Sequence, residues 1–205
     1  MSASIPSAFA DSDDQRHQPY NFHLIGIGLS AGGLEPLKAI VSQMPASIRA
    51  AVIVVHNDPI EASGLTQNLQ EITQLPVIKV TKKERIRAGH IFVPAAGCRF
   101  QLRDRVLSVE NIGPGRKSGR LIDACFRAIA YEAREKSICV ILSGSGYDGL
   151  EGAIVVERHG GMVIAQDPAT ARFPMMPVTV IANDDPTFVL EPDHIGRLIA
   201  GRLDK

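Results

Sequence analysis

Short apolar runs recur along this chain and alternate with segments of helical periodicity, and this alternation limits the folds open to it. The clearest runs are AAVIVV at residues 50–55 and SICVIL at residues 137–142. Continuous Val and Ile runs are typical of strands buried on both faces of a parallel sheet. Helical patterns cover residues 33–44 and 121–135, the second with a clear apolar face. We therefore predict one doubly wound α/β domain, with a mostly parallel sheet and helices on both faces in three α/β/α layers.

The remaining elements follow from the same patterns. Further strands are predicted at residues 22–27, 77–80, 91–93, 162–165 and 188–190, and further helices from residue 65 and over 150–159, 174–181 and 194–203. Two more short strands, at residues 100–103 and 105–109, flank a turn-like Arg-Asp-Arg. We expect these two strands to form a hairpin at the edge of the sheet.

The first 20 residues differ from the rest because they are rich in Ser, Asp and Pro and lack periodicity. We expect a disordered leader over residues 1–20 and one folded domain over residues 21–205. The leader has no apolar core of the kind that a signal peptide needs, and no apolar run approaches the roughly 18 residues of a membrane span. These features predict a cytoplasmic protein without membrane insertion.

Charge and cysteine content narrow the function classes. The 22 basic and 22 acidic residues give a net charge of zero, which argues against a broad nucleic-acid surface. The three cysteines have no metal-like spacing and are expected to be buried, reduced thiols. No cofactor and no metal are expected. The Gly, Pro and basic stretch at residues 112–120 is either a surface connector, which its composition favours, or a binding loop.

The sequence LIGIGLSAGG at residues 24–33 combines an apolar run with a glycine-rich turn and a following helix. Residues 28–32 fit G-x-S-x-G in the strand–turn–helix context of a nucleophile elbow. Glycines on both sides of Ser30 permit the sharp turn that presents a serine hydroxyl to substrate. An elbow also brings the backbone N–H of Ala31 close to a developing oxyanion.

The same stretch has a second interpretation. Gly26, Gly28 and Ala31 also satisfy the dinucleotide fingerprint G-x-G-x-x-G/A, and the stretch alone does not choose between the two. The fingerprint expects an acidic residue about 20 residues further on, at the end of the next strand. His56 occupies that place and Asp58 lies two residues late. The nucleophile elbow is therefore the favoured interpretation.

Three predicted strands end in residues that suit one kind of chemistry. Ser30 follows the first strand, His56 follows AAVIVV, and Asp148 lies in the glycine-rich turn after SICVIL. Ligands of parallel sheets bind beyond the carboxyl ends of the strands. A serine hydroxyl needs an imidazole to take its proton, and the imidazole needs a carboxylate to fix its tautomer. The three positions together predict a Ser-His-Asp triad.

These segments resemble the catalytic domain of the CheB-type protein-glutamate methylesterases of bacterial chemotaxis. IGLSAGG at residues 27–33 is close to the family's I-G-A-S-[AT]-G-G, VVHNDP at residues 54–59 to its V-[VQ]-H-x-x-P, and LSGSGYDG at residues 142–149 to its L-[ST]-G-x-G-x-D-G. Weaker matches are AQDP at residues 165–168, the pair Met176-Pro177 and the pair Ile122-Asp123. The resemblance extends from about residue 22 to the C-terminus, so it covers the predicted folded domain.

The resemblance implies a serine hydrolase that removes methyl esters from glutamyl side chains of methyl-accepting chemoreceptors, releases methanol, and deamidates receptor glutamines. It implies Ser30 as the nucleophile, His56 as the base and Asp148 as the residue that orients the base. It also implies the backbone N–H of Ser145 as an oxyanion donor and Met176 as a residue lining the pocket.

The resemblance also implies partners and one departure. The expected partner is the helical cytoplasmic domain of a chemoreceptor. Family members usually carry an N-terminal receiver domain, which the 20 leader residues are too few to form, so we expect either a stand-alone esterase or a domain cut from a longer chain. For a stand-alone esterase, a separate response regulator or kinase of a phosphorelay is a further expected partner. Leu29 stands where the family keeps a small residue and is expected to narrow the pocket. Two alternatives stay open: a nucleotide-binding Rossmann-like domain, and a non-catalytic receptor-binding module.

Overall fold

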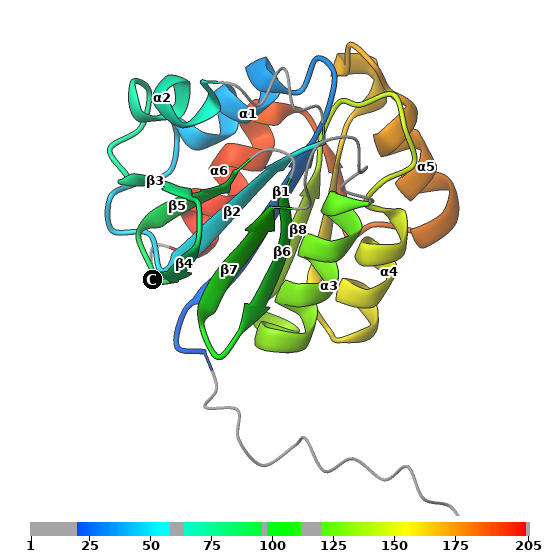
Figure 1. Ribbon diagram of the computed structural model, residues 1–205. Coiled ribbons are helices and arrows are strands. Elements are labelled where there is room, and N and C mark those ends of the chain that lie inside the picture. The colour runs from blue at the N-terminus through cyan, green and yellow to red at the C-terminus, as the bar shows by residue number, and fades with distance from the viewer. Residues whose placement is uncertain (1–19, 58–63, 96–97, 112–119, 204–205) are drawn as a thin grey trace, which may run out of the picture.

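A parallel sheet of seven strands forms the centre of the molecule (Figure 1). The computed structural model describes residues 20–57, 64–95, 98–111 and 120–203. The sheet has the strand order β10-β9-β8-β1-β2-β5-β3. Its strands are β1 (His23–Leu29), β2 (Ala50–His56), β3 (Val77–Val80), β5 (His90–Pro94), β8 (Ser137–Ile141), β9 (Met162–Gln166) and β10 (Phe188–Leu190). The helices are α1 (Leu34–Val41), α2 (Leu65–Gln70), α3 (Leu121–Ala133), α4 (Leu150–Arg158), α5 (Met175–Asp184) and α6 (Pro192–Leu203), with 3-10 turns at Arg134–Lys136 and Pro168–Thr170.

Helices cover both faces of this sheet, because successive strand residues point to opposite sides. Leu24 and Ile53 pack with α3, α4 and α5 on one face. Ile25 and Val52 pack with α1, α2 and α6 on the other. Figure 1 shows α3, α4 and α5 together on one side of the sheet. The predicted three-layer, doubly wound fold is confirmed.

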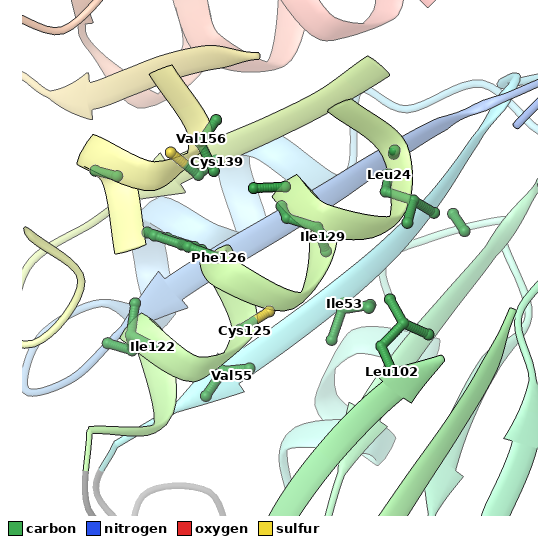
Figure 2. Packing of buried hydrophobic residues seen from close by; sticks show 14 of the residues in the cluster. Leu24, Ile53, Val55, Leu102, Ile122, Cys125, Phe126, Ile129, Cys139 and Val156 are labelled. Atoms are coloured by element: carbon green, nitrogen blue, oxygen red, sulfur yellow. The ribbon is translucent and has the colours of Figure 1, made fainter. Parts of the chain in front are cut away.

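Glycines let α3 lie very close to the sheet. Phe126 is fully buried, and Figure 2 shows it with Ile122 and Ile129 along one side of α3. A Cβ added at Gly26 would lie 3.1 Å from the Phe126 ring, and one added at Gly28 would lie 3.2 Å from it. The Cβ at Gly28 would also overlap Ile122. The start of α3 therefore sits directly over the end of β1, where Ser30 follows.

The predicted hairpin is confirmed, but its strands do not extend the main sheet. Strands β6 (Cys98–Arg103) and β7 (Val106–Asn111) pair antiparallel around Asp104-Arg105, and β7 also pairs with β4 (Lys83–Arg85). These strands form a separate sheet in the order β4-β7-β6, whose apolar residues join the core on the α3 side. The sequence did not predict β4, because KER is short, charged and only partly buried.

The folded part of the chain includes Tyr20, which we had assigned to the leader. Its ring is buried, its hydroxyl donates to Glu132 at 2.8 Å, and the Arg105 guanidinium lies 4.9 Å from the ring centroid. Burial and the Glu132 carboxylate raise the pKa of Tyr20. The rest of the predicted leader, and residues 112–119 of the predicted connector, lie outside the described residues.

The three cysteines are free and buried, as expected, and burial raises the pKa of the Cys125 and Cys139 thiols. Within the described ranges, no helix is both long and apolar enough to cross a membrane.

The raised pKa of the Asp184 carboxyl indicates that the stability of the folded chain depends on pH. Burial and the neighbouring Glu157 carboxyl raise the pKa of Asp184 to about 7 from an ordinary value of 3.8. Between these values the folded chain holds a proton that the unfolded chain has lost, so stability falls as pH rises through this range. We expect Asp184→Asn to raise the free energy of unfolding by about 1 kcal/mol at pH 8, or roughly 2–4 °C in Tm, with no gain at pH 4.

Thermal unfolding at the two pH values checks this. Asp193→Asn is the matched control, because Asp193 is an exposed aspartate at the start of α6. Equal gains for Asp184→Asn at pH 4 and pH 8 would contradict the assignment of the effect to ionisation.

Candidate active site

The carboxyl ends of β2, β1 and β8 bring the predicted site residues to one edge of the sheet. Leu29 is the register partner of His56, so Ser30 follows β1 directly beside the end of β2. On the other side, the Ser30 N–H donates to the Ser143 carbonyl at 3.0 Å, just beyond β8. Ser30 thus lies between these two strand ends, and it is half-buried.

A tight turn follows Ser30. The Gly33 N–H donates to the Ser30 carbonyl at 3.0 Å, and Gly32 has φ +72°, which favours glycine. The turn leads into α1 at once. Leu29 is fully buried and packs in the core on the α1 side. Our expectation that Leu29 narrows the pocket is therefore wrong: its side chain points into the core and away from solvent.

His56 is the last residue of β2 and is 7% exposed. The next N–H, of Asn57, donates to the Leu29 carbonyl at 3.0 Å, which ties the end of β2 to the residue before Ser30. His56 lines a cavity of about 10 Å³, too small for a substrate, together with Leu121 at the start of α3. The imidazole is therefore held among packed groups beside the strand that leads to Ser30.

Asp148 is 6% exposed and its carboxylate contacts the start of α3. Oδ2 accepts from the Ile122 N–H at 3.0 Å and Oδ1 accepts from the Asp123 N–H at 2.9 Å. Burial, together with the nearby Asp123 carboxylate, raises the pKa of Asp148 to about 6. The two N–H groups act in the opposite direction and lower it. Asp148 is thus brought to the α3 terminus that adjoins His56, while a bond from Asp148 to the imidazole stays a prediction.

Two backbone N–H groups, of Ala31 and Ser145, are the predicted oxyanion donors. Ala31 follows Ser30, and Ser145 lies in the exposed part of the 142–149 loop. Neither N–H donates a hydrogen bond to any residue in the described part of the chain. Their role as oxyanion donors stays a prediction.

Met176 packs behind the turn that carries these groups. Its N–H donates to the Gly144 carbonyl at 3.1 Å, and its side chain is 1% exposed against Gly144. A Cβ at Gly144 would overlap Met176 Sδ and lie 3.0 Å from Ser30 Cβ. The neighbouring Met175 is the methionine that is exposed, at 44%.

Ser143 and Gln166 support the turn that follows Ser30, and sequence reasoning assigns no role to either. Both are fully buried, and the Ser143 N–H donates to Gln166 Oε1 at 2.9 Å. Ser143 Oγ donates to the Ala31 carbonyl at 2.9 Å and accepts from the Phe173 N–H at 3.0 Å. The polar residues in the matched segments LSG and AQD were the only sequence signal for this contact.

Ser143→Ala is expected to loosen the turn after Ser30, because the Ala31 carbonyl and the Phe173 N–H both lose their partner. We expect about a tenfold loss of kcat on an activated ester and a loss of about 1–2 kcal/mol in stability. Kinetics and urea unfolding measure both. Ser108→Ala removes an exposed serine bond in β7 and is the control. Wild-type values for both quantities in Ser143→Ala would contradict the supporting role.

An open groove of about 480 Å³ lies between α4 and α5, beside the 142–149 loop. Tyr147, Met175 and Val178 line it and expose 60%, 44% and 41% of their surface. Arg120 and Glu151 form an ion pair at its rim. Among the described residues, no group of three His, Cys, Asp or Glu side chains has the arrangement of a metal site.

The comparison with protein families agrees with this geometry. The family model described as CheB methylesterase matches residues 25–199. The chain belongs to the CheB methylesterase family. The match includes every strand end described above, so the resemblance drawn from the three motifs is confirmed.

Individual relatives and one solved structure extend the comparison. A Leptospira interrogans protein named putative protein-glutamate methylesterase/protein-glutamine glutaminase is 28% identical, over 90% of this chain and 96% of that protein. A Yersinia pestis protein-glutamate methylesterase/protein-glutamine glutaminase is 27% identical over 88% of this chain, but the aligned region spans only 53% of that protein. The crystal structure of the Thermotoga maritima CheB methylesterase catalytic domain superposes with a TM-score of 0.80 at 25% identity, over 88% of this chain and 98% of that domain.

Proposed function

We propose that this chain is a serine hydrolase that cleaves methyl esters of glutamyl side chains on a methyl-accepting chemoreceptor. The observation that carries the proposal is the pairing of Leu29 with His56, because it brings the backbone of Ser30 next to the strand that ends in the buried His56. The family assignment supports the same reaction. The chain acts in the cytoplasm, on the helical domain of the receptor.

The reaction proceeds through an acyl-enzyme. Ser30 Oγ attacks the ester carbonyl carbon while His56 takes the hydroxyl proton. His56 then gives this proton to the leaving methoxide, and methanol departs. Water attacks the acyl-enzyme with His56 as the base, which frees glutamate and restores Ser30. Asp148 fixes the imidazole orientation and stabilises its cation.

The oxyanion that forms in both steps needs donors in place. The N–H groups of Ala31 and Ser145 supply them, and each such donor contributes about 2.7–4 kcal/mol of barrier lowering in comparable enzymes. The same steps with ammonia as the leaving group convert a receptor glutamine to glutamate. Deamidation is therefore a second reaction of this site.

The surroundings of Ser30 favour a macromolecular substrate. The cavity at His56 is too small for a ligand, whereas the neighbouring groove is open and apolar. Small-molecule enzymes enclose most of their ligand. An ester on a protein side chain reaches a half-buried serine from outside and needs no such enclosure.

Mass spectrometry of a methylated receptor fragment tests the proposal. Incubation with the protein should convert glutamyl methyl ester to glutamate, and more slowly glutamine to glutamate. A preparation that is folded and binds the fragment, yet leaves both groups unchanged, would indicate the non-catalytic binding module instead. Binding of NAD without esterase activity would indicate the Rossmann-like alternative.

A further inference from the structure

Two buried aspartates exchange caps between helices α3 and α4. Asp148 lies before α4, yet its carboxylate accepts from the Ile122 and Asp123 N–H groups in the first turn of α3. Asp123 lies in α3, yet its Oδ1 accepts from the Gly149 N–H at 3.0 Å and from the Gly152 N–H at 2.8 Å, at the start of α4. The start of α3 is therefore capped by an aspartate that precedes α4, and the start of α4 is capped by an aspartate of α3.

Neither helix has a cap of its own. The residues at the two N-cap positions, Arg120 and Gly149, make no side-chain capping bond. The first N–H groups of a helix need acceptors, and its N-terminus stabilises negative charge. Both helix starts thus depend on the exchanged carboxylates, and both carboxylates are at most 6% exposed.

The exchange acts directly on the backbone of Asp148. The Gly149 N–H that Asp123 holds belongs to the peptide bond joining Asp148 to Gly149. Gly149 has φ +106°, a backbone conformation that residues with a side chain rarely adopt. Asp123 therefore fixes the peptide from which the Asp148 side chain projects, while the N–H of Asp123 itself holds the Asp148 carboxylate.

Charge couples the two residues as well. Asp123 is 1% exposed and lies 3.6 Å from the Arg120 guanidinium, which also pairs with Glu151 on α4. The negative charge of Asp123 raises the pKa of Asp148. The Cys125 thiol on α3 is a further titratable neighbour, and burial and the Asp148 charge raise its pKa.

We propose that Asp123 is a positioning residue of the esterase: through the exchanged caps it sets the place of the Asp148 carboxylate that orients His56. The proposal rests on the function proposed above. Asp123 itself does not touch substrate. Its removal should therefore lower kcat and alter the pH profile while leaving KM nearly unchanged.

Two substitutions separate geometry from charge. Asp123→Asn keeps an oxygen acceptor for Gly149 and Gly152 but removes the charge. We expect kcat within about threefold of wild type, and an acidic limb of the kcat profile displaced to lower pH, because the pKa of Asp148 falls. Asp123→Ala removes both acceptors. We expect a loss of about 30-fold or more in kcat, with restoration in the Asn variant.

Asp193→Asn is the matched control, since Asp193 is an exposed first-turn aspartate of α6. NMR titration of the Asp148 carboxyl in wild type and Asp123→Asn measures the coupling without enzyme turnover, so it stands if the proposed substrate is wrong. An unmoved Asp148 titration, or a folded Asp123→Ala with wild-type kcat, would overturn the proposal. If Asp123→Ala fails to fold, the Asp123→Asn titration and pH profile decide.

Discussion

Ser30→Ala is expected to abolish ester hydrolysis, with kcat falling by at least about 10⁴-fold and the fold intact. The alanine removes only the hydroxyl of a half-buried residue whose backbone bonds, to Ser143 and Gly33, do not involve the side chain. No acyl-enzyme forms without that oxygen. The proposed binding surface and the proposed oxyanion donors are kept, so substrate binding should survive.

A fluorophosphonate probe provides a second measurement of the same claim. Wild type should be labelled on Ser30, and Ser30→Ala should not be labelled. Ser42→Ala is the control, because the Ser42 hydroxyl bonds only a carbonyl on the exposed end of α1. Hydrolysis by folded Ser30→Ala at the wild-type rate would mean that Ser30 is not the nucleophile.

Phe126→Ala is expected to cost about 3–5 kcal/mol of folding free energy, the largest stability effect we predict. The ring is fully buried where α3 meets β1, and the lack of a Cβ at Gly26, Gly28 and Gly152 leaves space for it. A stability of 5–15 kcal/mol is typical of a domain, so the loss is a large part of the total. Urea unfolding should show it, with a fall in Tm of roughly 6–20 °C.

Tyr131→Ala on the same helix is the matched control. Tyr131 is 57% exposed and its ring contacts His159 at the surface. We expect its loss to cost no more than about 1 kcal/mol. Similar losses for the two variants would show that helix propensity, rather than core packing, determines the effect at Phe126.

Periodicity predicted the main sheet because its central strands are buried on both faces and form continuous apolar runs in the sequence. The runs at β2 and β8 are of this kind, and the structure lengthens β2 by only one residue, His56. The hairpin was predicted from its turn, yet its pairing with Lys83–Arg85 was missed. A short charged strand has no apolar pattern, so its pairing depends on the tertiary fold.

The sequence predicted those parts of the candidate site that lie at the ends of strands. Ser30 and His56 each follow an apolar run, and parallel pairing brings such ends together. The exchanged caps of Asp123 and Asp148 and the bonds of Ser143 depend on how helices meet, which no local pattern encodes. The burial of Leu29 was misjudged for the same reason, since a residue type does not reveal which face it occupies.

Methanol release from a methylated chemoreceptor, by wild type and by His56→Gln, tests the central claim most directly. Glutamine fills similar space but cannot take the Ser30 proton, so the rate should fall by about 10³-fold or more. His194→Gln, at an exposed histidine on α6, should release methanol at the wild-type rate. Equal methanol release by folded His56→Gln and wild type would contradict a hydrolase built on Ser30 and His56.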